Sequence, residues 1–82
     1  MVKATFDPEF RKSFLKIKDS LLKKKIIKRV EKLKENPALG KPMRYERKGT
    51  RELYVPPFRL AYAYVEEEDT IIILGIYHKN KQ

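Results

Sequence analysis

The hydrophobic pattern of the chain changes at Asn36-Pro37, and this change restricts the folds that the sequence can adopt. Before this point apolar residues recur every three or four positions, which is the spacing of one helix face. After it apolar and polar residues alternate, as in half-buried β-strands. The residue before a proline disfavours the helical conformation, so a helix is expected to end here. The sequence therefore predicts an α+β domain with its helices first and most of its sheet last.

Two consecutive helices are predicted in the first half of the chain. Asp7 can cap the first helix, and Pro8 suits its first position. Two apolar series share helical spacing but differ in phase by one residue: Phe6, Phe10, Phe14, Ile17 and Leu21, then Leu22, Ile26, Val30 and Leu33. The phase shift falls beside Asp19-Ser20, where either residue can cap a second helix. We therefore expect a helix hairpin, with one long bent helix as the alternative.

A short strand at residues 2–6 precedes the helices, and several strands follow them. The later candidates are residues 43–47, 51–55, 58–65 and 70–78, separated by turns at 48–50, 56–57 and 66–69. The last two strands and their acidic four-residue loop predict a β-hairpin. The whole chain, residues 1–82, is expected to form one domain with the helical pair on one face of a mainly antiparallel sheet.

Strict alternation predicts which side chains share a face of that hairpin. Residues 58–65 place on one bulky face Phe58, Leu60, Tyr62 and Tyr64, and on the other Arg59, Ala61, Ala63 and Val65. Residues 70–78 place on one face Ile72, Leu74, Ile76 and His78, and on the other Ile71, Ile73, Gly75 and Tyr77. If Gly75 joins the two alanines, the sheet has a shallow trough that ends at Arg59, Tyr77 and Lys79. Such a floor admits a polymer close to the backbone, or is simply a second apolar surface.

The charge balance favours a polyanionic partner. Twenty Lys and Arg residues against eleven Asp and Glu give a net charge of +9, which suits nucleic acid, an acidic protein or a membrane surface. Most cations of residues 1–40 are helix lysines, which we interpret as a solvated face. A second cluster lies mainly between residues 41 and 59 and is rich in Arg, which suits bidentate phosphate contacts. We predict RNA contacts for Arg44, Arg47, Lys48, Arg51 and Lys81.

Other function classes are disfavoured by what the sequence lacks. It has no Cys and one His, which argues against disulfides and zinc cages. Its three Gly residues form no Gly-rich phosphate loop. Its apolar runs are shorter than the ~20 residues of a membrane span, and its first residues lack the apolar core of a signal peptide. We therefore expect no cofactor, no metal, no membrane contact and a cytoplasmic location.

Three C-terminal segments resemble the RelE/ParE toxin superfamily: residues 49–55 (GTRELYV), 58–62 (FRLAY) and 71–79 (IIILGIYHK). These toxins show an Arg-Leu strand, a Tyr/Phe-Arg-hydrophobic-hydrophobic-Tyr strand and a last strand that ends in a basic group. The predicted N-terminal strand and helix hairpin match these toxins as well, so the resemblance covers nearly the whole chain. It is closest to the RelE branch. It implies a compact toxin of a type II toxin–antitoxin system that cleaves mRNA in the ribosomal A site. It also implies neutralisation by a small acidic, RelB-like antitoxin.

The resemblance assigns roles to residues at one end of the sheet. Arg59 stands at the position of the central-strand arginine that contacts the scissile phosphate region, and Lys79 stands where many members have Arg. His78 falls where several members have a His that contributes to cleavage. Lys48 and Arg51 lie near the basic residues that precede the central strand. Many RelE-type nucleases have a catalytic Tyr in a C-terminal tail, which this sequence does not show.

The implied chemistry is attack of a ribose 2′-OH on the adjacent phosphate, which needs a base, an acid and charge stabilisation. We expect Arg59 and Lys79 to stabilise the phosphate charge, and His78 or Tyr77 to assist proton transfer. Alternation aims His78 away from Arg59, so packing against the helix side is its alternative role. Arg59 needs an acidic partner if its role is structural. The alternatives for the whole protein are a ParE-like gyrase inhibitor and a non-catalytic basic RNA-binding module.

Overall fold

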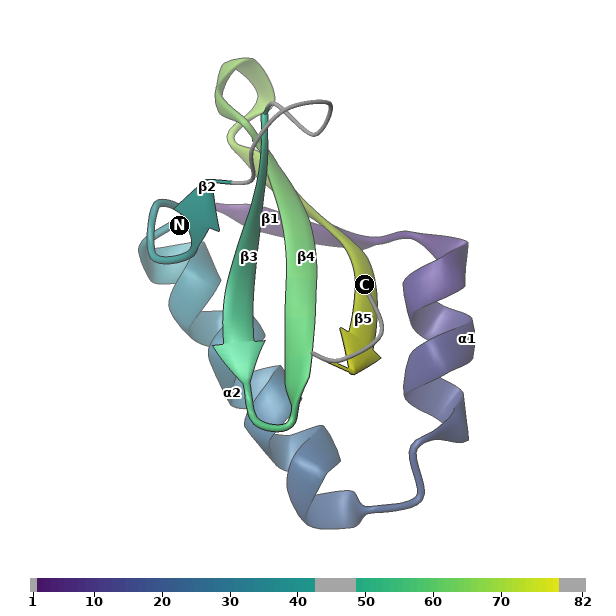
Figure 1. The fold of residues 1–82 in the computed structure, drawn as a ribbon. Coiled ribbons are helices and arrows are strands. Elements are labelled where there is room, and N and C mark those ends of the chain that lie inside the picture. The colour runs from purple at the N-terminus through teal and green to yellow at the C-terminus, as the bar shows by residue number, and fades with distance from the viewer. Residues whose placement is uncertain (1, 43–48, 79–82) are drawn as a thin grey trace.

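The order of elements along the chain is a strand, two helices and then further strands (Figure 1). The computed structural model describes residues 2–42 and 49–78. In these ranges the elements are β1 (Lys3–Phe6), α1 (Pro8–Lys16), α2 (Ser20–Glu35), β2 (Lys41–Pro42), β3 (Thr50–Val55), β4 (Phe58–Val65), the 3-10 turn η2 (Glu66–Glu68) and β5 (Thr70–His78). The predicted α+β class is therefore confirmed. The strand predicted at residues 43–47 lies outside the described residues.

The five described strands form one sheet in the order β1-β5-β4-β3-β2. Neighbouring strands are antiparallel except β1, which runs parallel to β5 at the sheet edge. Both helices lie on the same side of the sheet, with α2 crossing behind β3 and β4 (Figure 1). The predicted placement of the helices on one face is confirmed, and the other face of the central strands carries no helix within the described ranges.

Each helix begins at an aspartate, as the sequence indicates. The Asp7 carboxylate accepts the Glu9 amide at 2.9 Å, and Pro8 occupies the first turn of α1. Asp19 accepts the amides of Leu21 and Leu22 at 3.0 and 3.2 Å. Because the chain is extended at Ile17, between the helices, two helices are confirmed and one long bent helix is wrong.

The core lies between the two helices and the sheet. α1 contributes Phe10, α2 contributes one apolar stripe, and the strands contribute the residues that point toward the helices. The buried apolar residues are Val2, Phe10, Ile26, Val30, Leu33, Leu53, Val55, Leu60, Tyr62, Ile71 and Ile73. Leu53 and Val55 lie on one face of β3, because both are buried and they alternate with the exposed Tyr54.

β5 departs from strict alternation at Leu74. Gly75 pairs with Ala61 on β4, but the next pair is Ile73 with Tyr62, so the register shifts at this point. This β-bulge turns the preceding residues to the opposite face. Ile71 and Ile73 therefore lie in the core, each 0% exposed, and their predicted position on the Gly75 face is wrong.

The segment after α2 is held to the sheet by Tyr62. Its hydroxyl donates to the Pro37 carbonyl at 2.7 Å and accepts the Gly40 amide at 2.8 Å. Burial raises the pKa of the Tyr62 phenol above its ordinary 10.0, against the opposing effects of the Gly40 bond and the Arg51 charge. A Cβ at residue 40 would lie 2.7 Å from the Glu52 carbonyl and from the Tyr62 ring, so only glycine fits here.

We expect Gly40→Ala to lower the free energy of unfolding by about 1–3 kcal/mol, because a methyl group there forces the backbone away from β3 and Tyr62. Gly75→Ala is the matched control, since nothing lies within 4 Å of a Cβ at that position. Its free energy of unfolding should stay within about 1 kcal/mol of the wild type. Urea unfolding measures both. Equal losses in the two variants would contradict the tight contact at Gly40.

We expect Tyr62→Phe to lower the free energy of unfolding by about 1–3 kcal/mol, because the Pro37 carbonyl and Gly40 amide lose their partner. The raised pKa of Tyr62 means that the unfolded chain ionises first as the pH rises. The stabilisation is therefore full below about pH 10 and declines above it. Unfolding measured across this range should show the gap between wild type and Tyr62→Phe narrowing. A constant gap would contradict the burial of this phenol.

Candidate nucleic-acid interface

The face of the sheet away from the helices brings together part of the predicted site. Arg59 pairs with Tyr77 across β4 and β5, and Ala61 pairs with Gly75. These pairs confirm that Gly75 shares the face of Ala61 and that Arg59 and Tyr77 lie at one end of it. The space above Gly75 is open, because no atom lies within 4 Å of the position that a Cβ would take there. Of the predicted floor, the Ala61 and Gly75 pair is therefore present, whereas Ala63 pairs with Ile72.

Glu52 of β3 links Arg59 and Tyr77, two of the predicted catalytic side chains, on this face. One carboxylate oxygen, Oε1, accepts from Arg59 Nη1, and the other, Oε2, accepts the Tyr77 hydroxyl at 2.7 Å. The Glu52 and Arg59 side chains are 21% and 34% exposed, so this ion pair is partly shielded from water. Arg59 Nε is buried and has no hydrogen-bond partner within the described part of the chain. Arg59 thus has the acidic partner that a structural role requires, on a face that is still open.

Glu52 is the site residue that sequence reasoning missed. β3 and β4 are joined by Pro56-Pro57, and the adjacent pair is Val55 with Phe58. Counting back from this pair sets Glu52 opposite Ala61, one diagonal step from Arg59. Such diagonal neighbours lie within reach of long side chains. The sequence signal for Glu52 is therefore the short turn at Pro56-Pro57, which sets the register between β3 and β4.

A pocket of about 380 Å³ lies beside the ion pair. It is lined by the start of β2, by β3 and by Arg59, and its residues are Leu39, Gly40, Lys41, Glu52, Leu53, Tyr54 and Arg59. The volume suits a small ligand or one nucleotide unit. Lys41 and Arg59 give this pocket two cationic residues. An anionic group that enters it would meet the Arg59 guanidinium beside Glu52.

Two other predicted residues, Arg51 and His78, lie on the helix side of the sheet. Arg51 points to the opposite side of β3, where its Nη1 donates to the Gly40 carbonyl at 2.7 Å and to the Ala38 carbonyl at 3.3 Å. His78 pairs with Phe58, away from Arg59, and the two rings meet edge to face at a centroid distance of 5.7 Å. Five predicted residues fall outside the described ranges: Arg44, Arg47, Lys48, Lys79 and Lys81. RNA-binding and catalytic roles for all of these residues stay predictions.

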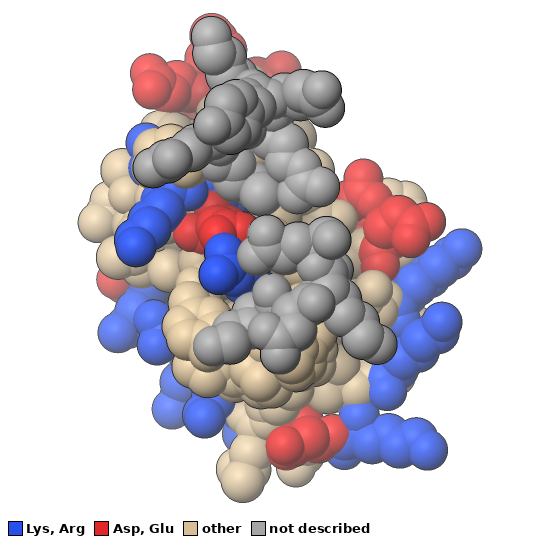
Figure 2. All heavy atoms as spheres, viewed as in Figure 1, with Lys and Arg blue, Asp and Glu red and all other residues tan. Residues whose placement is uncertain are grey.

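Charge is unevenly spread over the molecule. In Figure 2 basic side chains project along both helical flanks, and acidic atoms gather at the end of the sheet that carries η2. Near the middle of the view, acidic and basic atoms lie next to each other. Among residues 2–42 and 49–78, no cluster of His, Cys, Asp or Glu fits a metal ion. No helix in those ranges is both long and apolar enough to cross a membrane.

Two helices behind a five-stranded sheet, with an arginine on the open face, define a RelE-like toxin fold. The toxin of the RelBE2 complex from Mycobacterium tuberculosis is similar, with a TM-score of 0.86, 25% identity and coverage of 95% of this chain and 98% of that chain. A chain of the intact Escherichia coli RelBE complex has a TM-score of 0.82 and 15% identity, with coverage of 95% of this chain and 96% of that chain. A chain of the YoeB dimer from Staphylococcus aureus has a TM-score of 0.79 and 22% identity, with coverage of 94% of this chain and 97% of that chain.

The sequence itself also matches a family model. The model of the ParE toxin of type II toxin–antitoxin systems matches residues 4–82, so the chain belongs to this toxin family within the RelE/ParE superfamily. No curated protein sequence matches the chain significantly. The predicted superfamily is thereby confirmed, while the reaction is a separate question.

We expect Arg51→Met to lower the free energy of unfolding by about 1 kcal/mol, because the Gly40 carbonyl loses a charged donor. Lys28→Met, at an exposed position of α2, removes the same charge and should change the free energy of unfolding by less than about 0.5 kcal/mol. Urea unfolding of both variants checks this. Equal stabilities would show that Arg51 does not hold the segment after α2.

Proposed function

We propose that this toxin inhibits translation as a ribosome-dependent mRNA endoribonuclease that cleaves in the A site. The observation that supports this most is the position of Arg59, which lies on the open face of the sheet and lines the pocket together with Glu52. A guanidinium offers paired donors that match phosphate oxygens. The low floor at Ala61 and Gly75 lets an RNA backbone approach this group closely.

In this proposal each of the predicted catalytic side chains has a separate role in cleavage. Arg59 holds the scissile phosphate and stabilises the charge that develops as the 2′-OH attacks. Tyr77 lies across from it and carries a hydroxyl for proton transfer. Lys79 adds positive charge in the same proposal. His78 is a weaker candidate than Tyr77, because its ring packs with Phe58 on the side away from Arg59.

The proposed partners are a cognate acidic, RelB-like antitoxin, the ribosome and mRNA, and the proposed location is the cytoplasm. The solved RelBE complexes hold related toxins together with their antitoxins. The net charge of +9 supports an acidic neutralising partner and attraction to ribosomal RNA.

A ParE-like gyrase inhibitor is the second candidate function. The family model that matches the chain is that of ParE toxins, which favours this alternative. The pairing of Arg59 with Glu52 favours it as well, because a neutralised arginine is less available to phosphate. A basic RNA-binding module without catalysis is a third outcome that the same experiment separates.

We expect the purified toxin to cut message on programmed ribosomes in the A site, and Arg59→Ala to reduce the rate by about 100-fold or more. The measurement is the mapping of message ends. Lys28→Ala, at an exposed position of α2, removes an equal charge and should stay within about threefold of the wild type. Gly75→Leu should also reduce cleavage, because its side chain fills the open floor while the fold is retained.

The same proteins are tested in a gyrase supercoiling assay. No A-site cleavage, with wild type and Arg59→Ala indistinguishable, would contradict the nuclease. Inhibition of supercoiling would then support the second candidate. Ribosome binding without either effect would support the non-catalytic module.

A further inference from the structure

We propose that Glu52 determines the specificity of this site by competing with RNA phosphate for Arg59. RNA then enters only when other contacts, such as those of a ribosome, hold it there. The inference rests on the proposed function, because it takes Arg59 as the phosphate ligand. It concerns binding, so it can be tested apart from cleavage.

The geometry supports competition because Glu52 already occupies Arg59. Its Oε1 accepts from Arg59 Nη1, and both residues line the same pocket. Carboxylate and phosphate present similar oxygen acceptors to arginine. The guanidinium has further N–H donors, so a phosphate either takes the Nη1 donor from Glu52 Oε1 or binds beside it, next to the negative charge of that carboxylate.

Tyr77 holds the competing carboxylate in place. Its hydroxyl donates to Glu52 Oε2 at 2.7 Å, so both oxygens of Glu52 are engaged and the group is fixed over the sheet. The Glu52 side chain is only 21% exposed, which limits the screening of its charge by water. An incoming phosphate therefore also meets a nearby negative charge that stays on the same face.

The rest of the surface makes such a competitor useful. A net charge of +9 attracts RNA of any sequence, and the helical flanks carry much of this charge (Figure 2). Without Glu52, that general attraction would bring RNA directly onto an unoccupied arginine. With Glu52, Arg59 exchanges one anion for another, so the net gain from a free strand is small. Contacts made elsewhere must then supply the remaining affinity.

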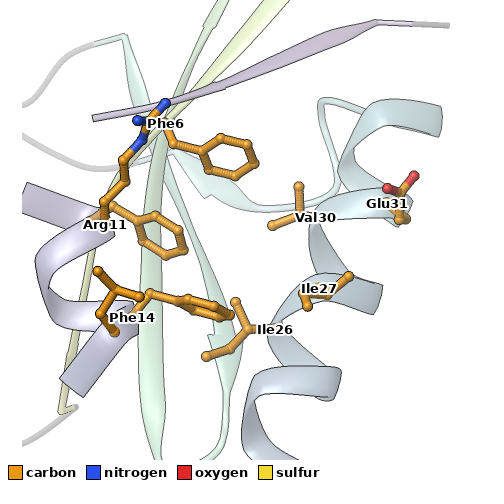
Figure 3. Close-up of a pocket in the computed structure, with 9 residues that line it drawn as sticks. Phe6, Arg11, Phe14, Ile26, Ile27, Val30 and Glu31 are labelled. Carbon is orange, nitrogen blue, oxygen red and sulfur yellow. The ribbon is translucent and has the colours of Figure 1, made fainter. Parts of the chain in front are cut away.

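The other large feature of the molecule does not touch this site. An apolar pocket lies between α1 and α2, with Phe6, Phe14, Ile26, Ile27 and Val30 directed into it and Arg11 and Glu31 at its border (Figure 3). It lies on the helix side of the sheet, whereas the Glu52 and Arg59 pair lies on the open face. RNA binding at Arg59 can therefore be measured with this pocket unchanged.

The test measures the Kd of a labelled 2′-O-methyl oligoribonucleotide, which lacks the attacking 2′-OH, by fluorescence anisotropy at low salt. We expect Glu52→Gln to tighten Kd by about tenfold, since a charged hydrogen bond no longer competes. Glu67→Gln, in the exposed η2 turn, makes the same change in net charge and should tighten it by about twofold or less. When Arg59→Gln is already present, adding Glu52→Gln should tighten Kd no more than Glu67→Gln does, because the arginine for which Glu52 and phosphate compete is gone.

The salt dependence of Kd gives a second readout that does not need the Arg59 variant to fold. A new phosphate contact at Arg59 should raise the slope of log Kd against log salt by about 0.7 in Glu52→Gln, and leave it unchanged in Glu67→Gln. Weaker binding by Glu52→Gln, equal effects of both Gln variants, or no binding by any protein would overturn the proposal. If the Kd values follow the expected pattern but the wild-type toxin does not cleave message in the A site, the proposed nuclease activity is overturned and the competition between Glu52 and phosphate is supported.

Discussion

The bulge at Leu74 is the local constraint on which both the core and the site depend. It allows one strand to place Ile71 and Ile73 beneath the helices and Gly75 and Tyr77 on the open face. A regular strand would place all four on the same side. The interior would then lose two fully buried side chains, or the open face would lose its low floor. Bulges near functional surfaces redirect side chains in this way.

The two faces of the sheet make different kinds of contact, and two adjacent residues of β3 show this difference. Arg51 turns toward the carbonyls that follow α2, and Glu52 turns toward Arg59 and Tyr77. One side of the strand thus supports the fold, and the other side tunes the charge of the open face. The neighbouring strand repeats this arrangement, because Tyr62 anchors the same segment from below while Arg59 lies above.

Much of the fold could be predicted because its boundaries depend on single residues with strong local effects. Asp7, Pro8, Asp19 and Asn36-Pro37 mark the helix ends, and the alternation in residues 58–65 marks a strand at its observed limits. The bulge could not be predicted, because residues 71–74 are all large and aliphatic and nothing distinguishes the unpaired one. The position of Glu52 near Arg59 could be predicted from the short turn at Pro56-Pro57, which sets the register of the two strands. Its contacts with Arg59 and Tyr77 could not, because alternation predicts the face of a side chain and not its partners.

The edges of the sheet have a consequence for the toxin when it is not bound to a partner. An edge strand exposes backbone groups on which another chain can add a strand, and long edges therefore promote aggregation. Here β1 has four residues, and the described part of β2 is Lys41–Pro42. Lysine hinders strand addition by its charge, and proline does so because it has no amide hydrogen. In the described part of the chain, both edges therefore hinder the addition of a strand from a second copy of this protein.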